Sequence, residues 1–425
     1  MATLINGYGN VISVGESVVT MEPAIDDIPT IYWDGIGGAA IPLTKAEGEI
    51  QGTVRYLSKT LDFSEYATIK VQGHGSATEP YKIKNYTMKF YEDADFLVKS
   101  GHKFRDFGKL KKVVLKKHFN DCSHIRNVGT ARLWGQIVRS RSDFAALPEE
   151  LRKAPNNSAT NGFTVRVFAN GVYMGLYELI VPKDKIFGQD DDNPYHSIMG
   201  VGASTDDGAF NNATPTLDNW EEELQDSMTE MAATSMKSLI AFVTTSTDEE
   251  FVEGIGNYLD IQSVIDMIIF LRLFCIVDNL NRNQIYFSYD SAFWYEGGWD
   301  FDCVLGLGPS LTGGMTDNPE LVYPDGYKSY NNLYTRTETL FLTRCKERYA
   351  ELRNGVLSVS NVISVFDEIA QTIANYDGLR EEDWAETTAE GMGVYIPYTD
   401  TNNIQQIRDF VRKRWAYMDG VIEAM

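Results

Sequence analysis

The pattern of apolar positions predicts a β-rich first half of the chain. Runs of β-branched and aromatic residues, bounded by Gly, Asn, Asp or Pro, predict strands at 50–56, 67–72, 86–91, 112–116, 163–169 and 172–181. The last two runs flank Asn170-Gly171, a pair that is typical of a tight hairpin. A further strand is expected from Ile28 onward. One helix interrupts these strands, because Asp121 can cap its start and apolar residues then recur at near-helical spacing up to Ile137.

The second half is predicted to be mainly helical. Apolar residues three and four positions apart predict helices at 218–244, 259–276, 337–353, 359–374 and 403–424. The segments 188–216 and 306–332 are rich in Gly, Asn and Asp, so we expect them to be loops. We therefore predict an α+β protein with three parts, which are an N-terminal arm or docking segment at 1–27, a β-rich part at 28–185 and a mainly helical part at 186–425.

Composition narrows the class of protein and of partner. With 43% hydrophobic and 12% aromatic residues over 425 positions, the chain can bury a large core. A formal net charge of −22 argues against a nucleic-acid partner, because phosphate binding depends on neutralisation by Lys and Arg. The basic stretch 109–117 is an exception, and it is typical either of a solvated strand edge or of a site for nucleotide phosphates.

Nothing in the sequence predicts secretion or a membrane span. The first residues have neither a basic start nor a continuous apolar run, so no signal peptide is expected and the chain should fold in the cytoplasm. The most apolar segment, 261–277, contains Asp266 and Arg272 and is short for a bilayer, which favours a buried helix. The four cysteines lie far apart without metal-ligand spacing, so buried, reduced thiols are expected.

Acidic and amide side chains cluster around a predicted hairpin in the second half. Asp278 and Asn283 lie five residues apart, and Trp299-Asp300-Phe301-Asp302 follows at the end of the hairpin. Protein kinases use this arrangement to hold magnesium and to orient a substrate hydroxyl. Carboxylate and amide oxygens suit Mg²⁺, which would be held by Asp300 and Asn283, while Asp278 would accept or orient the proton of the attacking hydroxyl.

The expected strand register supports this grouping. The hairpin is predicted from strands at 285–289 and 293–299 with a turn at 290–292. This pairing places residue 283 opposite about residue 299, and therefore Asn283 beside Asp300. A slip of one residue would favour Asp302, which ranks second as a metal ligand. Each motif by itself is also typical of ordinary structure, either an Asn- and Asp-rich turn or a strand with exposed carboxylates.

Candidates for phosphate binding lie in the β-rich part. Gly75 and Ser76 belong to a Gly-His-Gly-Ser segment whose backbone amides and hydroxyl could approach phosphates, although a hairpin or bulge is an equal alternative. Lys116 follows Val-Val-Leu and precedes the helix that Asp121 begins, as the phosphate-clamping lysine of kinases precedes its helix. That helix carries no Glu to pair with Lys116, so Lys82 and Lys84 remain alternatives.

From Ile28 onward the chain resembles the CotH kinase family, which is known from spore coats and from bacterial and phage proteins. The resemblance is carried by Gly73-His-Gly-Ser76, Val114-Leu-Lys116, the run from Phe168 to Tyr177, the loop from Asp278 to Asn283 and Trp299-Asp-Phe-Asp302. It implies a two-lobed atypical protein-kinase-like fold with a β-rich N-lobe and a helical C-lobe, ATP and Mg²⁺ as cofactors, and phosphorylation of serine on structural proteins. By resemblance, the catalytic and metal positions are Asp278, Asn283 and Asp300.

The sequence departs from the family and kinase patterns at three places. Gln72 stands where a basic residue often precedes the first glycine, Ile276-Val277 replaces the His-Arg of the kinase loop, and Asp302 replaces the Gly that follows Asp-Phe in kinases. Two hypotheses follow. The first is an ATP- and magnesium-dependent protein Ser/Thr kinase that acts on proteins of the assembly it joins. The second is a structural subunit of a virion, such as a phage tail or baseplate, or of a spore coat, with a kinase-like fold as scaffold and with homo-oligomers allowed.

Overall fold

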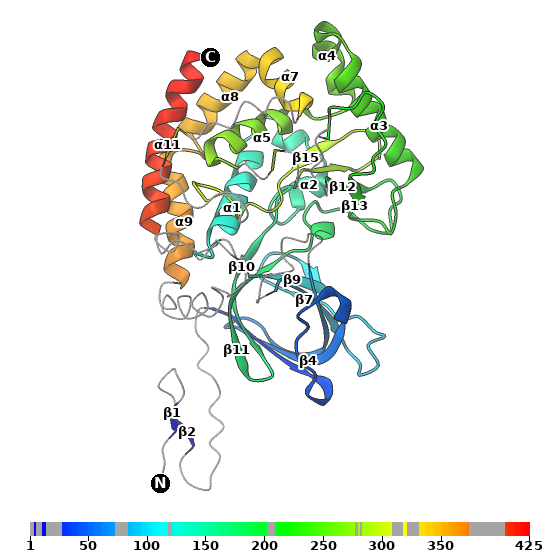
Figure 1. The fold of residues 1–425 in the computed structure, drawn as a ribbon, viewed down its shortest axis with the longest axis vertical. Helices are drawn as coiled ribbons and strands as arrows, with labels where there is room; N and C mark the ends of the chain where they lie inside the picture. The colour runs from blue at the N-terminus through cyan, green and yellow to red at the C-terminus, as the bar shows by residue number, and fades with distance from the viewer. Residues whose placement is uncertain are drawn as a thin grey trace.

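The computed structural model describes residues 4–5, 11–13, 28–72, 84–117, 121, 123–201, 209–276, 279–280, 283–307, 318–320, 331–373 and 404–425. Figure 1 shows a β-barrel at one end of the body and a group of helices at the other. The strands β1 (Leu4–Ile5) and β2 (Val11–Ser13) pair with each other, and the rest of the predicted N-terminal arm at 1–27 lies outside the described residues.

Seven of the described strands close into a barrel in the order β10-β11-β9-β6-β5-β4-β3. The strands are β3 (Thr30–Gly35), β4 (Ile50–Leu57), β5 (Asp62–Val71), β6 (Tyr86–Tyr91), β9 (Lys112–Lys116), β10 (Gly162–Ala169) and β11 (Val172–Ile180). Neighbours are antiparallel except β3 and β10, whose parallel pairing closes the barrel. Each expected strand of the β-rich part is confirmed, and Asn170-Gly171 forms the β10–β11 turn with both residues at positive φ.

The helices form most of the remaining structure. They are α1 (Arg126–Arg139), α2 (Glu149–Lys153), α3 (Glu230–Thr245), α4 (Asp248–Gly254), α5 (Ile261–Phe274), α7 (Asn332–Leu340), α8 (Leu342–Asn354), α9 (Val359–Ile373) and α11 (Ile404–Ala424). Short 3₁₀ turns occupy Ile36–Gly38, Lys45–Glu47, Phe144–Ala146, Lys183–Lys185 and Ile255–Asn257. The predicted helix at 259–276 is confirmed as α5, which is buried on nearly every side.

The helix α1 leaves the barrel between β9 and β10 and packs among the other helices (Figure 1). The carboxylate of Asp121 accepts hydrogen bonds from the backbone N–H groups of Ile125 and Arg126 and so stabilises the start of the helix, but the N-cap residue is Ile125, so the prediction of Asp121 as N-cap was wrong by four positions. The ring of Trp134 packs on Phe270 of α5 with ring centroids 5.3 Å apart. The barrel and the helices therefore share one continuous core.

A second sheet lies within the helical part and corrects two predictions. Its strand order is β13-β12-β14-β15, formed by Trp220–Glu222, Ser197–Val201, Ile285–Ser288 and Tyr295–Gly297. The strand β12 lies in the segment 188–216, for which a loop was the wrong prediction. The helix predicted at 218–244 is also wrong over its first 12 residues, because β13 lies in that stretch and α3 begins only at Glu230, after Thr229 caps it.

Two smaller features complete the fold. The strands β7 (His102–Lys103) and β8 (Lys109–Leu110) form a separate small sheet. In the part of the chain that the structure describes, no single helix is long and apolar enough to cross a bilayer, and α8 with α9 would qualify only as a pair bent by 57°. Cys275, Cys303 and Cys345 are buried and form no disulfide bond, as expected, while Cys122 lies outside the described residues. The chain is thus an α+β protein, with a closed barrel that the sequence did not predict.

Candidate functional site

A lysine from the barrel and an aspartate from the helical part meet at their junction. Lys116 is the last residue of β9, and Asp300 follows β15 at a distance of 184 residues along the chain. Their side chains form an ion pair in which the Lys116 side chain is 9% exposed and that of Asp300 26%. Burial works against the charge of Lys116, but the negative charges of Asp300, Asp302 and Glu178 outweigh it and raise the pKa of this lysine. The ammonium group is therefore charged at neutral pH.

The backbone at Asp300 is held in an unusual conformation. Its φ is +59°, in the left-handed region, where Asp is tolerated better than most residues. The next backbone N–H, that of Phe301, donates to the Asn127 side-chain oxygen at 2.9 Å, and the Phe301 ring packs edge-on against Phe270. The turn that carries Asp300 is thus tied to α1 by its main chain and to α5 by its aromatic ring.

The hairpin has the register that the sequence predicts, with shorter strands. Ile285 pairs with Gly297 in an antiparallel ladder, so the same register carried two residues further places residue 283 opposite residue 299. The Asn279 side-chain amide bridges these positions, because Nδ2 lies 2.7 Å from the Trp299 carbonyl oxygen and 3.4 Å from that of Asn283. The backbone of Asn283 is therefore brought next to the Trp299–Asp300 peptide.

The remaining predicted site residues are placed less completely. Asp302 lies in the same turn as Asp300, partly exposed, and its charge acts on Lys116. Lys84 is buried two residues before β6, and the adjacent Asn85 accepts a hydrogen bond from the Lys117 backbone at 2.7 Å, so Lys84 lies at the same end of the barrel as the end of β9. Asp278, Gly75, Ser76 and Lys82 lie outside the described residues, and their roles stay predictions.

Glu178 is a part of this site that the sequence analysis missed. It lies directly opposite Lys116 in the β9–β11 pairing, so both side chains point to the same face, and it is 1% exposed. The helix α1 carries no Glu, and this carboxylate comes from the neighbouring strand β11. A single Glu within the otherwise apolar run Leu176-Tyr-Glu-Leu-Ile was the available signal.

A second lysine also reaches the site. Lys183, just after β11, lies with its ammonium 5.0 Å from the centre of the Trp299 ring, while that of Lys116 lies 4.9 Å from the same ring. Lys183 also pairs with Glu223 at 2.6 Å. Two cations therefore flank the residue that precedes Asp300, a concentration of positive charge that would suit an anionic ligand.

The chain was compared with known proteins. A family model for CotH kinase protein matches residues 70–418, which is most of the chain and includes every described residue of this site. The chain belongs to the CotH kinase protein family. No curated protein matched the chain. Family membership supports a kinase-like protein. In this CotH family member, the residues described above are the candidates for a kinase-like site.

The second strand of the hairpin in this CotH family protein carries a buried carboxyl group. Glu296 of β15 is 1% exposed and accepts hydrogen bonds from the hydroxyl groups of Tyr334 and Tyr286, while its backbone N–H donates to the Ser263 hydroxyl at 3.0 Å. Burial raises the pKa of Glu296 to about 8, although the two tyrosine hydroxyls lower it in part. The carboxyl is therefore largely protonated at neutral pH and supports the hairpin as a neutral group.

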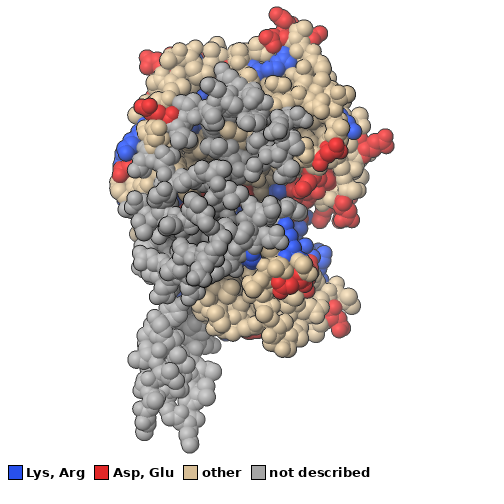
Figure 2. Space-filling model, in the orientation of Figure 1, with Lys and Arg blue, Asp and Glu red and all other residues tan. Residues whose placement is uncertain are grey.

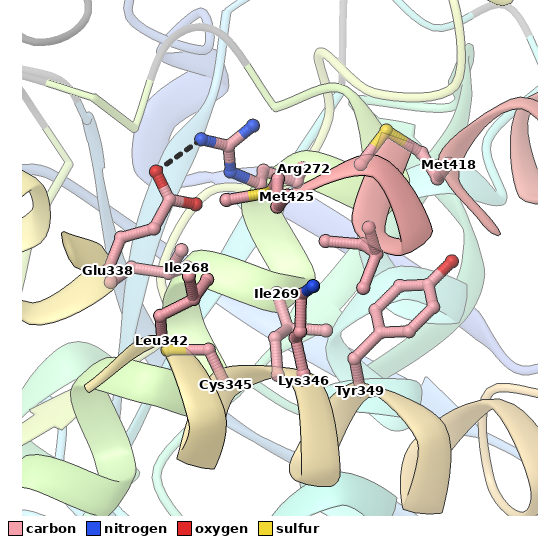
Figure 3. Close-up of a pocket in the computed structure, with 11 residues that line it drawn as sticks. Ile268, Ile269, Arg272, Glu338, Leu342, Cys345, Lys346, Tyr349, Met418 and Met425 are labelled. Atoms are coloured by element: carbon pink, nitrogen blue, oxygen red, sulfur yellow. Dashed lines mark hydrogen bonds and ion pairs between the residues drawn. The ribbon is translucent and has the colours of Figure 1, made fainter. Parts of the chain in front are cut away.

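Two further hollows lie away from the ion pair. The cavity in Figure 3, of about 10 Å³, is bordered by α5, α8 and α11, has a mainly apolar lining and lies beside the Arg272–Glu338 ion pair. The other is an open groove of about 440 Å³ that contains Lys109, Glu150 and Lys153. Figure 2 shows Lys and Arg side chains gathered at the junction of the barrel and the helical part, with Asp and Glu side chains beside them. The mixed charge favours no ligand class for the groove.

Proposed function

We propose that this CotH family protein is an ATP- and magnesium-dependent protein kinase that phosphorylates Ser or Thr on proteins of the assembly to which it belongs. The observation that carries this proposal is the partly buried ion pair between Lys116 and Asp300. In this proposal, the barrel and the helical part correspond to the two lobes of an atypical kinase fold. A nucleotide bound between these lobes would then have its phosphates at the ion pair.

The donor set around the ion pair fits magnesium and phosphate. Asp300 provides a partly exposed carboxylate, Asp302 a second one, and Asn283 lies across the hairpin. The Asn279 amide, whose nitrogen bonds the Trp299 carbonyl, has its own oxygen buried without a hydrogen-bond partner among the described residues. Oxygen ligands of these kinds are the ones that Mg²⁺ prefers. A cation bound here would neutralise charge on the transferred phosphoryl group.

Each residue then has a defined task in the proposal. Lys116 would hold nucleotide phosphates, and Glu178, opposite it on β11, would keep its ammonium group in place when the Asp300 carboxylate turns to the metal. Lys84 is a second candidate for the phosphates. Asp278, by its resemblance to the kinase loop, would orient the hydroxyl of the substrate and accept its proton. Gly75 and Ser76 would add backbone and hydroxyl donors to the phosphates.

The substrates and location are proposed on the family alone. The family resemblance favours serine-containing structural proteins of a virion or spore coat, with synthesis in the cytoplasm and later incorporation into that assembly. The negative charge of the chain gives no reason to propose a nucleic-acid partner.

The proposal is tested first by Mg²⁺-dependent ATP binding to the full chain. At a ligand concentration of 100 times the dissociation constant, binding adds about 2.7 kcal/mol to the free energy of unfolding, which a thermal denaturation experiment detects. Lys116→Met and Asp300→Asn are expected to abolish this stabilisation. Lys111→Met, an exposed lysine on the same stretch, and Asp62→Asn, in an exposed ion pair with Arg55, are matched controls that are expected to retain it.

Phosphoryl transfer is tested separately with radiolabelled ATP. Labelling of the chain itself or of a co-purified assembly protein is expected, with loss in Asp278→Ala and Asp300→Ala while the fold is retained. Labelling that persists in both variants contradicts the assignment. Absence of both ATP binding and labelling in the unmodified protein favours the scaffold hypothesis, in which a virion or coat subunit keeps the kinase-like fold without its activity.

A further inference from the structure

Asn127, at the second position of α1, connects the barrel to the turn that carries Asp300. Its side-chain oxygen accepts a hydrogen bond from the Phe301 backbone N–H at 2.9 Å, and its side-chain nitrogen donates to Glu178 Oε2 at 3.1 Å. The residue is 1% exposed, so both bonds are shielded from water. A short side chain that offers one acceptor and one donor at the same time is a carboxamide, which explains Asn at this position.

The bond to Phe301 acts on Asp300 through the backbone. The N–H group belongs to the peptide that joins Asp300 to Phe301, so fixing its direction fixes the ψ angle of Asp300. The φ angle of this residue is +59°, a conformation that needs support from its surroundings. Asn127 thereby determines where the Asp300 carboxylate points, while its bond to Glu178 sets that direction relative to the strand opposite Lys116.

We propose that Asn127 is a positioning residue. Its hydrogen bond to the Phe301 peptide orients the Asp300 carboxylate for metal binding, and its hydrogen bond to Glu178 fixes the position of this carboxylate relative to the barrel. This inference rests on the proposed function, since it concerns the same site. It assigns to α1 the task of coupling the two parts of the site. No atom of Asn127 needs to touch the metal or the nucleotide.

The pairing of Asn127 with Glu178 allows a test by exchange of donor and acceptor. Asn127→Asp keeps an acceptor for Phe301 but places a second carboxylate against Glu178, and like charges at this distance repel. Glu178→Gln restores a donor, so the double variant Asn127→Asp/Glu178→Gln recreates the hydrogen bond with the two groups exchanged.

The first experiment measures the Mg²⁺ concentration that half-saturates ATP binding in full-length variants. Loss of a residue that orients a ligand typically weakens metal affinity by about 10- to 100-fold, so Asn127→Asp is expected to raise the half-saturating Mg²⁺ concentration by this factor. In the Glu178→Gln background the same change is expected to have little effect. Asn156→Asp is the matched control, because Asn156 is also buried and donates to α1, at the Ala131 carbonyl.

The outcomes separate positioning from general destabilisation. Asn156→Asp is expected to lower thermal stability without changing the half-saturating Mg²⁺ concentration. An Asn127→Asp protein with normal Mg²⁺ dependence overturns the proposal, and so does an equally large effect in the Glu178→Gln background. The double variant keeps the test open even if the single variant does not fold, because a half-saturating Mg²⁺ concentration well above that of the Glu178→Gln protein also overturns the proposal.

A second measurement does not depend on the proposed function. Amide hydrogen exchange at Phe301 is expected to be faster in Asn127→Leu, which removes the acceptor, than in the unmodified protein. Unchanged exchange overturns the positioning role. If the unmodified protein binds no Mg²⁺ and ATP, the proposed function fails, while the exchange result still decides whether Asn127 anchors the turn.

Discussion

Neutralising Glu296 is expected to change how the stability of the protein depends on pH. The carboxyl of Glu296 is 1% exposed, and burial raises its pKa from an ordinary value of 4.5 to about 8. Between these two pH values the native state binds one more proton than the unfolded state, so the free energy of unfolding falls as pH rises. Glu296→Gln mimics the protonated acid and keeps an acceptor for the hydroxyl groups of Tyr334 and Tyr286. The Glu296→Gln substitution should therefore remove the decrease in the free energy of unfolding between these two pH values.

The size of the effect follows from the shift. Each pH unit between the two pKa values costs about 1.4 kcal/mol, so the buried carboxyl removes about 3 kcal/mol between pH 4.5 and pH 7. Above about pH 8 both states are ionised and the loss no longer grows. Glu296→Gln is therefore expected to match the unmodified protein near pH 5 and to exceed its stability by about 3 kcal/mol at pH 7.

Urea denaturation at pH 5, 6 and 7, followed by tryptophan fluorescence, measures the difference between the two proteins. Contributions from other titrating groups cancel in this difference, provided that the dependence on urea stays the same. Glu253→Gln, at an exposed position of α4, serves as the control and should follow the unmodified protein at every pH. A difference between Glu296→Gln and the unmodified protein that stays constant from pH 5 to pH 7 would refute the raised pKa.

Three further predictions concern packing around the site. Gly298→Ala would place a methyl group 2.5 Å from the Phe301 ring, so a loss of about 1–3 kcal/mol in urea denaturation is expected, and unchanged stability would contradict this packing. Arg348→Ala leaves the Asp266 carboxylate buried without its partner at 2.7 Å, which should cost about 3–5 kcal/mol by the same assay; a loss under 1 kcal/mol would show that the pair is solvated. Burial raises the pKa of Cys345 to about 12, so its alkylation at pH 8 should require urea, and rapid labelling of the native protein would speak against this.

Local signals in the sequence predicted the hairpin of the site well. Turn residues between two β-rich runs determined both its existence and its register, so that the juxtaposition of Asn283 with the Trp299–Asp300 peptide followed from counting residues. The placement of Lys116 at the end of a strand before a helix was equally local. These features depend on interactions over a few residues, which is why pattern and spacing were sufficient to find them.

Contacts between distant segments were not predictable in the same way. The pairing of β9 with β11 brings Glu178 opposite Lys116, and nothing local specifies which strands become neighbours. Closure of the barrel by parallel pairing of β3 with β10 is similarly non-local. The strand β12 was missed because Gly, Asn and Asp around it are typical of a loop, and only its pairing with β13 and β14 makes it a strand.

The path of α1 has a consequence for any attempt to divide this protein. The chain makes a helical excursion from the barrel, in which Gly129 lies so close to the Phe366 ring that a Cβ would be 2.4 Å from it, and Trp134 lies against Phe270. If residues 28–185 were expressed alone, the apolar surface of α1 would be exposed to water. If residues 186–425 were expressed alone, the apolar side chains that contact α1 would be exposed instead. Neither fragment is expected to fold by itself. A truncated protein should therefore keep the barrel and the helical part together.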